Sequence, residues 1–326
     1  MRQILVIASD NNLSKQLLLS FQKSENIISV IGLFEKEKAQ VFPQDFWSDN
    51  KIEWIDTDIM DVLGMESHMQ SIDVLYHVAA PQFFDNDTSS TRHNQLEFWT
   101  EQLVDLAIGA KVKRIIYLSS AFVLKTKSQD VIIDEQSEFE HNAGNTLTGI
   151  LYRTEQQIWR AWAEGVEVSI LHPSLILDAN PSAESKGHWF QNIQALSCLD
   201  PSLGFDFIDI RDVLRALKAV DSEEGKNERF VLSEGHYNLE SIRAAIFEEG
   251  QDNNAFSCFK ITLMKWLWKI GINWSLDKRF NFSVLKELTR TKKIFSNAKS
   301  KKLILPHYIS VKDSLKQWLE ARNISS

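Results

Sequence analysis

Short apolar runs alternate with longer amphipathic stretches through the first half of the chain. The runs are continuous, which is typical of strands in a parallel sheet whose two faces are both covered by helices. The predicted strands are Ile4–Ile7, Ile27–Leu33, Ile52–Ile55, Val74–His77, Ile115–Leu118, Val168–Leu171 and Phe230–Leu232. They predict a sheet that draws its strands from both halves of the chain.

The stretches between these runs predict amphipathic helices. Leu13–Phe21, Phe98–Ile108 and Ile150–Trp162 each carry apolar side chains three or four positions apart, which places those side chains on one helix face. Strands and helices that follow one another in this way form strand-helix-strand units. The pattern therefore predicts an α/β fold with a Rossmann-type doubly wound parallel sheet.

The regular alternation weakens after about residue 174. A loop at 178–187, a second set of helices and an aromatic stretch near 255–285 follow. We therefore expect residues 1–173 to form a Rossmann-type nucleotide-binding core. Residues 174–326 are expected to complete the sheet and to form a smaller C-terminal substrate lobe.

The chain is acidic, with 36 Lys and Arg residues against 44 Asp and Glu residues and a net charge of −8. Nucleic acids bind clustered cations, so we expect no nucleic-acid partner. The two cysteines, Cys198 and Cys258, form no disulfide framework, and neither they nor the eight histidines show metal-ligand spacing. We therefore expect no metal site. No apolar segment predicts a signal peptide or a spanning helix, so we expect a cytoplasmic protein.

Short motifs follow the predicted strands in a characteristic order. They are Asp58-Ile59, Tyr76-His77-Val78-Ala79-Ala80, Tyr117-Leu118-Ser119-Ser120-Ala121, Ile170-Leu171-His172-Pro173, Phe207–Val213 and Ser296-Asn297-Ala298-Lys299. In this order they resemble the motifs of the extended short-chain dehydrogenase/reductase family, in particular the branch of 3β-hydroxysteroid dehydrogenases and dihydroflavonol reductases. The resemblance covers nearly the whole chain and implies the same Rossmann-type fold.

The resemblance implies a site for NAD or NADP beside the first strand. Ala8, Asn11 and Ser14 stand where the family has the glycines of its phosphate-binding turn. Their small or turn-tolerant side chains let the turn form, while Asp10 either repels a pyrophosphate or caps the next helix. The other implied cofactor-binding residues are Glu35, Asp58, Ile59, Ala79, Ala80 and Pro173. Charges of both signs follow the second strand, so the choice between NAD and NADP stays open.

The resemblance also implies catalytic positions. Ser120 stands where the family has its catalytic serine, at the carboxyl end of a strand. The alternative is that Ser119 and Ser120 only close this strand through side-chain hydrogen bonds. His172 replaces an arginine of the family, and it acts either as an acid or base near neutral pH or as a buried structural histidine.

The family's proton-donating tyrosine and its lysine partner are replaced. Counting back from His172 places Leu147 and Leu151 at these positions, and Glu155 then falls where the family often has a glutamate. Tyr152 points about 140° away from position 147 around the helix. The family's Asn-x-x-Gly-Thr motif falls on Leu96, Trp99 and Thr100, with Asn94 two residues earlier as the alternative asparagine.

These replacements leave three functions open. The first is a divergent family member that binds a bulky apolar hydroxy or keto compound, with or without NAD(P), and whose ordinary hydride transfer is impaired or absent. The second is a pseudoenzyme that serves as a ligand sensor or subunit. The third is a non-redox isomerase, lyase or cyclase that uses the same pocket.

Two further expectations concern partners. Residues 259–302 combine tryptophans with lysines, which indicates either a lid over an apolar ligand or a contact with a membrane surface. The resemblance implies a homodimer by analogy, because members of the family often pair through helices.

Overall fold

The structure is a computed structural model of the 326-residue chain. The described residues are 2–8, 11–22, 24–32, 52–55, 61–79, 90–125, 132–139, 147–178, 204–238, 240–242, 244 and 294–324. The aromatic stretch near 255–285, and with it most of the expected substrate lobe, lies outside them. Among the described helices, none combines the length and the apolar composition needed to cross a membrane.

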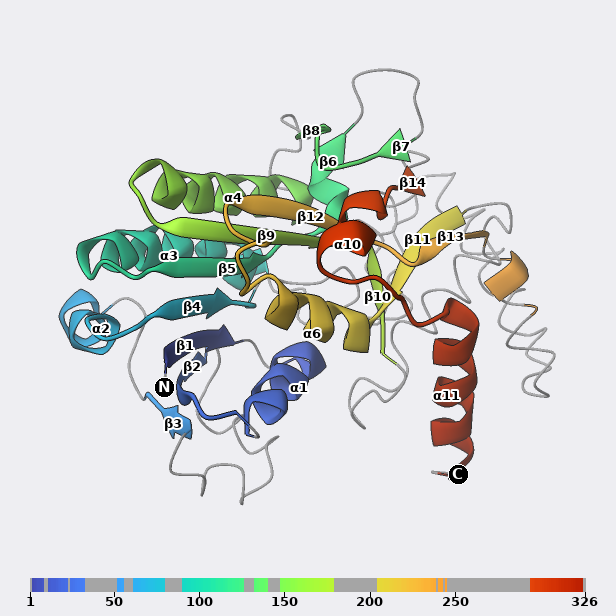
Figure 1. Ribbon diagram of the computed structural model, residues 1–326, viewed down its shortest axis with the longest axis horizontal. Coiled ribbons are helices and arrows are strands. Elements are labelled where there is room, and N and C mark those ends of the chain that lie inside the picture. The colour runs from blue at the N-terminus through green and yellow to red at the C-terminus, as the bar shows by residue number, and fades with distance from the viewer. Residues whose placement is uncertain are drawn as a thin grey trace, which may run out of the picture.

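A seven-stranded parallel sheet forms the centre of the fold (Figure 1). Its strands are β1 (Gln3–Ala8), β2 (Ile27–Gly32), β3 (Ile52–Trp54), β4 (Val74–His77), β5 (Arg114–Leu118), β9 (Glu167–Pro173) and β12 (Glu228–Leu232). They lie in the order β12-β9-β5-β4-β1-β2-β3, and every neighbouring pair is parallel. The Rossmann-type doubly wound sheet is therefore confirmed, and its strand order changes direction between β1 and β4.

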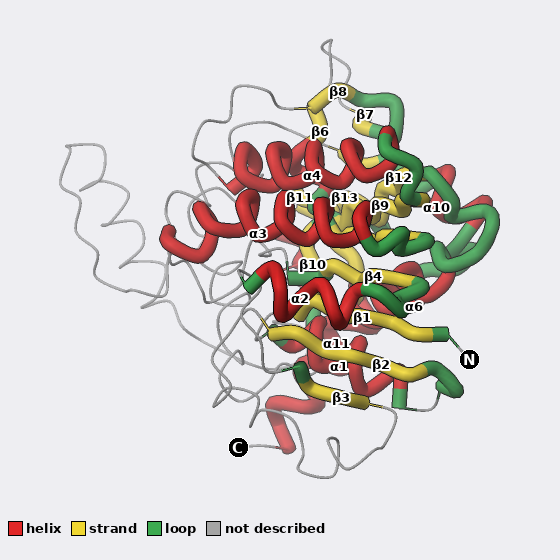
Figure 2. The backbone as a smooth tube through the Cα atoms, turned by 90° about the vertical axis from the view of Figure 1, so that its left-hand side faces the viewer, coloured by secondary structure: helices red, strands yellow, loops and turns green. Residues whose placement is uncertain are grey.

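Helices cover both faces of this sheet. The described helices are α1 (Asn12–Phe21), α2 (Val62–Met69), α3 (Ser90–Gly109), α4 (Leu147–Ala163), α6 (Ile210–Ala219), α10 (Ala298–Leu303) and α11 (Val311–Ile324). Helices α3 and α4 lie side by side on one face, and α1 and α6 lie on the other (Figures 1 and 2). The helix predicted from Phe98 begins earlier in the structure, at Ser90. The pattern missed this start because residues 90–95 are all polar and show no apolar stripe.

Alternate residues of the strands feed two apolar clusters, one beneath each helical layer. Leu5 and Ile7 of β1 pack toward α3 and α4, whereas Ile4 and Val6 pack toward α1 and α6. Successive side chains of a strand point to opposite faces, so a strand buried on both sides must be apolar throughout. This geometry explains the continuous apolar runs of the sequence.

Shorter elements follow the carboxyl ends of the strands. They are η3 (Ala121–Val123), β6 (Leu124–Lys125), β7 (Ile132–Ile133), β8 (Glu138–Phe139), β10 (Leu175–Leu177), β11 (Gly204–Asp209), β13 (Gly235–Asn238) and β14 (Ile294–Phe295). Strand β11 pairs with β10 in parallel and with β13 in antiparallel orientation, which forms a small second sheet. The chain thus builds additional structure at the edge of the main sheet where such folds gather ligands.

Candidate functional site

The candidate site lies outside the carboxyl ends of β1 and β4, where the strand order reverses. In open parallel sheets this reversal leaves a crevice for ligands. The predicted residue Ala8 ends β1 and is buried, and Ala79 follows β4. Both therefore lie at the edge that the sequence predicted, at the crossing between the two halves of the sheet.

Asn11 and Ser14 form the first turn of α1. The Oδ1 atom of Asn11 accepts the backbone N–H of Ser14 at 2.9 Å, and Asn11 itself has an extended backbone. This is an ordinary N-cap, which supplies an acceptor for one of the free N–H groups at a helix start. Asn11 thus explains how a helix begins here without glycine.

A second contact brings a carboxylate to the same turn. Asn12, the first residue of α1, donates its side-chain N–H to Oδ2 of Asp178, which directly follows β10. A pyrophosphate at this turn would need the N–H groups of the helix start. Because Asn11 already uses the Ser14 N–H and Asp178 adds an acid, the residues of this turn fit a dinucleotide pyrophosphate poorly.

The remaining predicted cofactor positions divide into two groups. Pro173 ends β9 and is buried. Glu35, Asp58, Ile59 and Ala80 lie outside the described residues, as does Asp10 in the turn itself. Their roles stay predictions.

Ser120 lies at the carboxyl end of β5, as predicted, and is 2% exposed. Its Oγ accepts the N–H of Phe122 at 3.4 Å and caps the short helix η3. The preceding residue, Ser119, donates its hydroxyl to Oε2 of Glu155 at 2.8 Å. The chain reversal after β5 is therefore held by both serines, and the Ser120 hydroxyl donates no hydrogen bond among the described residues.

Glu155 links the predicted residue His172 to this reversal. Both side chains are fully buried, and His172 Nε2 lies 2.9 Å from Glu155 Oε2, while Trp159 donates to Oε1 at 3.2 Å. Burial opposes ionisation, but the His172 imidazole and the hydrogen bonds from His172 and Ser119 keep the pKa of Glu155 below its ordinary value. His172 thus contacts an internal carboxylate, a placement that favours the structural alternative for this residue.

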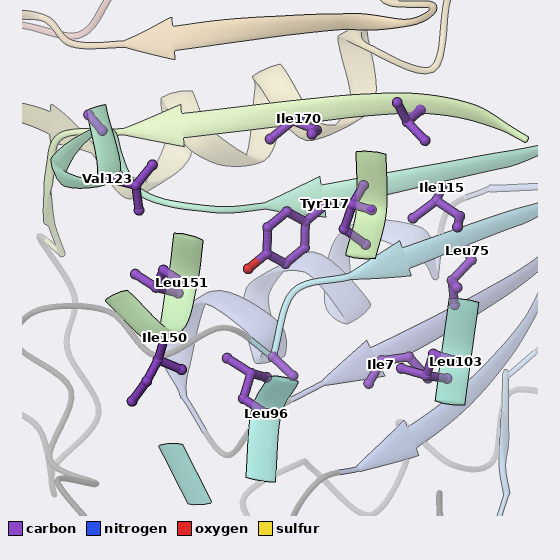
Figure 3. Packing of buried hydrophobic residues seen from close by; sticks show 14 of the residues in the cluster. Ile7, Leu75, Leu96, Leu103, Ile115, Tyr117, Val123, Ile150, Leu151 and Ile170 are labelled. Atoms are coloured by element: carbon purple, nitrogen blue, oxygen red, sulfur yellow. The ribbon is translucent and has the colours of Figure 1, made fainter. Parts of the chain in front are cut away.

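Helix α4 presents apolar side chains at the two positions where the resemblance predicts the family's tyrosine and lysine. Leu147 and Leu151 are buried and belong to one apolar cluster with Tyr117 of β5. Figure 3 shows Leu151 and Tyr117 of this cluster. Tyr152 instead packs its ring against Phe139, with ring centroids 5.3 Å apart. The described face of α4 toward β5 therefore carries neither a phenol nor an ammonium group at these positions.

The residues predicted in place of the family's Asn-x-x-Gly-Thr motif lie in α3. Thr100 donates its hydroxyl to the Leu96 carbonyl at 2.8 Å and lies 2.9 Å from Nε2 of His77. The side chain of Asn94 lies outside the described residues. Sequence patterns missed this His77–Thr100 contact and the Asn12–Asp178 contact, because each joins polar residues of different elements.

Comparison with known proteins agrees with this architecture. Residues 11–167 match the model of the 3-beta hydroxysteroid dehydrogenase/isomerase family. This match confirms the resemblance to the extended short-chain dehydrogenase/reductase family. Among curated proteins, none matches the sequence of the chain.

Solved structures share the fold of this chain. The yeast methylglyoxal/isovaleraldehyde reductase Gre2, complexed with NADPH, is 16% identical with a TM-score of 0.72, and the match covers 99% of each chain. The Bacillus cereus UDP-glucuronic acid 4-epimerase, with NAD, is 15% identical with a TM-score of 0.68, covering 99% of this chain and 100% of that one. The terminal R domain of the myxalamid pathway is 15% identical with a TM-score of 0.76, covering 100% and 91%.

Proposed function

We propose that the chain is a divergent short-chain dehydrogenase-like protein that binds a bulky apolar hydroxy or keto compound and lacks tyrosine-dependent hydride transfer. The ligand would occupy the crevice outside the carboxyl ends of β4 and β5, with its oxygen at the hydroxyl of Ser120. The observation that carries the proposal is the pair of buried leucines, Leu147 and Leu151, on the α4 face toward β5.

The loss of hydride transfer follows from what leucine side chains cannot do. Reduction of a ketone by hydride requires a general acid to protonate the developing alkoxide, and positioned acids contribute roughly 10²–10⁴-fold to such rates. Leu147 has no proton to give, and Leu151 has no charge to lower the pKa of a neighbouring acid. Of the described residues Leu147, Leu151 and Ser120, only Ser120 offers a hydrogen bond, which suits binding better than proton transfer.

The similarity to a reductase of carbonyl compounds supports the ligand class. The yeast enzyme named above is a methylglyoxal/isovaleraldehyde reductase. With Leu147 and Leu151 in the apolar cluster, no phenol or ammonium group at these two positions would contact the ligand. A ligand with a large apolar body and one oxygen fits this combination, because apolar burial supplies affinity and one hydrogen bond fixes orientation.

The proposal is tested by measuring binding and turnover separately. A panel of apolar ketones and their alcohols is titrated against tryptophan fluorescence, and NADH or NADPH oxidation is followed with each ketone. We expect saturable binding of at least one compound and no turnover above background. Ketone-dependent oxidation at about 1 s⁻¹ or faster, an ordinary enzyme rate, would contradict the proposal.

A pair of serine variants locates the ligand. Ser120→Ala should weaken binding by roughly threefold to tenfold, the effect of losing one hydrogen bond of about 0.5–1.5 kcal/mol. Ser67→Ala serves as the matched control, since Ser67 is exposed on α2 and donates only to the Gly64 carbonyl. Equal affinities for both variants and the unaltered protein would remove Ser120 from the site.

A further inference from the structure

The Asn12–Asp178 hydrogen bond joins two parts of the fold that the sheet keeps apart. Asn12 begins α1, immediately beyond the carboxyl end of β1. Asp178 follows β9 and β10, and β9 is separated from β1 in the sheet by β5 and β4. The segment that leaves β9 therefore crosses the carboxyl edge of the sheet to reach the first turn of α1.

Two oxygen atoms of the chain itself thus occupy this helix start. Oδ1 of Asn11 accepts the Ser14 N–H, and Oδ2 of Asp178 accepts from the side chain of Asn12. The N-terminus of a helix attracts anions through its free N–H groups and its dipole. A carboxylate held beside this turn by the side-chain amide of Asn12 opposes the negative charge of a phosphate group at the same helix start.

We propose that Asp178 determines ligand specificity at this groove by excluding dinucleotide phosphates from the first turn of α1. The Asn12–Asp178 hydrogen bond holds the carboxylate in place. Ligands without phosphate, which need no contact at this turn, are not affected. The proposal goes beyond the function proposed above, because it depends on neither Leu147 nor Leu151 and holds for any ligand of the crevice.

Two substitutions of the aspartate separate its charge from its hydrogen bond. Asp178→Asn keeps an oxygen acceptor for Asn12 but removes the charge, and Asp178→Ala removes both. Asp105→Asn is the matched control. Asp105 of α3 forms an ion pair with Arg160 of α4, and the substitution removes one negative charge from this pair. Each protein is titrated with NADH and NADPH by nucleotide fluorescence and with ADP by calorimetry.

We expect both Asp178 variants to bind the nucleotides at least about tenfold more tightly than the unaltered protein and Asp105→Asn. The proposal would be overturned if the unaltered protein bound a nucleotide with micromolar affinity and both Asp178 variants changed that affinity by less than twofold. Absence of binding by all four proteins at millimolar nucleotide would overturn it as well, because Asp178 would then not be what excludes the phosphates.

Two additional measurements keep the result interpretable. Near-UV circular dichroism and the melting temperature show whether each variant is folded. Asn12→Ala, which leaves Asp178 intact but removes the hydrogen bond between the two side chains, provides an independent variant. Asn12→Ala should also bind nucleotide more tightly, and unchanged affinity would count against the anchoring contact. Titration of the same variants with an apolar ketone separates the two proposals, since only the function proposed above fails if no ketone binds.

Discussion

At the residue scale, the His77 side chain shows how burial fixes a protonation state. The ring is 1% exposed, and the Thr100 hydroxyl next to it sends its proton to the Leu96 carbonyl. Thr100 Oγ1 therefore accepts from His77 Nε2–H, which makes the ring the neutral Nε2–H form. The Nδ1 atom has no hydrogen-bond partner among the described residues, so a proton there would be buried without an acceptor.

This arrangement predicts a loss of stability in mild acid. Burial lowers the pKa of His77 from 6.5 to about 4 in the folded protein. As the pH falls from 6.5 toward 4, the unfolded chain binds a proton that the folded chain does not, so the free energy of unfolding decreases. The decrease attributable to His77 is about 3 kcal/mol, and urea unfolding at a series of pH values measures it.

Two variants assign this pH dependence. His77→Phe keeps an aromatic ring beside Tyr117 but cannot titrate, so its profile should be flatter between pH 6.5 and 4. Thr100→Val keeps the imidazole and should lower stability without flattening the profile. A profile of His77→Phe that runs parallel to that of the unaltered protein would show that another group is responsible.

Glu155 and His172 mark the limit of what residue patterns predict. Sequence spacing placed Glu155 on α4 and His172 at the end of β9, and both positions agree with the structure. The contact between Glu155 and His172 depends on how α4 packs over the sheet. The spacing of residues along the chain does not determine the distance between these two side chains. For the same reason the pattern left His172 open between catalysis and structure.

At the element scale, strands of the main sheet were predictable because their physical constraint is local. A strand buried on both faces has to be apolar at every position, and Val74–His77 was predicted with its observed bounds. Strand β11 was not predicted, because polar residues interrupt it. Its Asp206 is buried and accepts from Ser233 and from the N–H of Phe295, which lie 27 and 89 positions away.

The turn between α6 and β12 depends on one of the few glycines of the chain. The sequence has 12 glycines, and Gly225 is buried against the end of α6. A methyl group at this position would collide with the Val220 carbonyl oxygen, a backbone atom that cannot rotate away. Gly225→Ala should therefore destabilise the protein by about 1–3 kcal/mol, the usual cost of overpacking, as measured by urea unfolding.

Gly109→Ala is the matched control for this substitution. Gly109 ends α3, and a methyl group there would meet no atom within 4 Å. Alanine favours helices over glycine by roughly 0.5–1 kcal/mol, so this variant should be as stable as the unaltered protein or slightly more stable. If Gly225→Ala lost less unfolding free energy than Gly109→Ala, that result would contradict the close approach of Gly225 to the Val220 carbonyl.

At the scale of the whole molecule, the second half of the chain is part of the core of the first. The cluster beneath α1 and α6 joins Ile4 and Val6 of β1 to Val213, Leu217 and Phe230, all of which come after position 173. The opposite cluster likewise includes Trp318 of α11, which is 3% exposed. The apolar surface that stabilises the sheet is thus supplied by both halves.

Residues 1–173 should therefore not fold as an independent unit. Without α6 and β12, one face of the sheet would expose apolar side chains that the whole chain buries, at roughly 25 cal/mol per Å². We expect the isolated fragment to lack a near-UV circular dichroism signal, to bind a hydrophobic dye and to unfold without a sharp transition in urea. Coexpression with residues 174–326 should restore a cooperative transition, whereas a sharp transition of the fragment alone would show that the first half is a domain by itself.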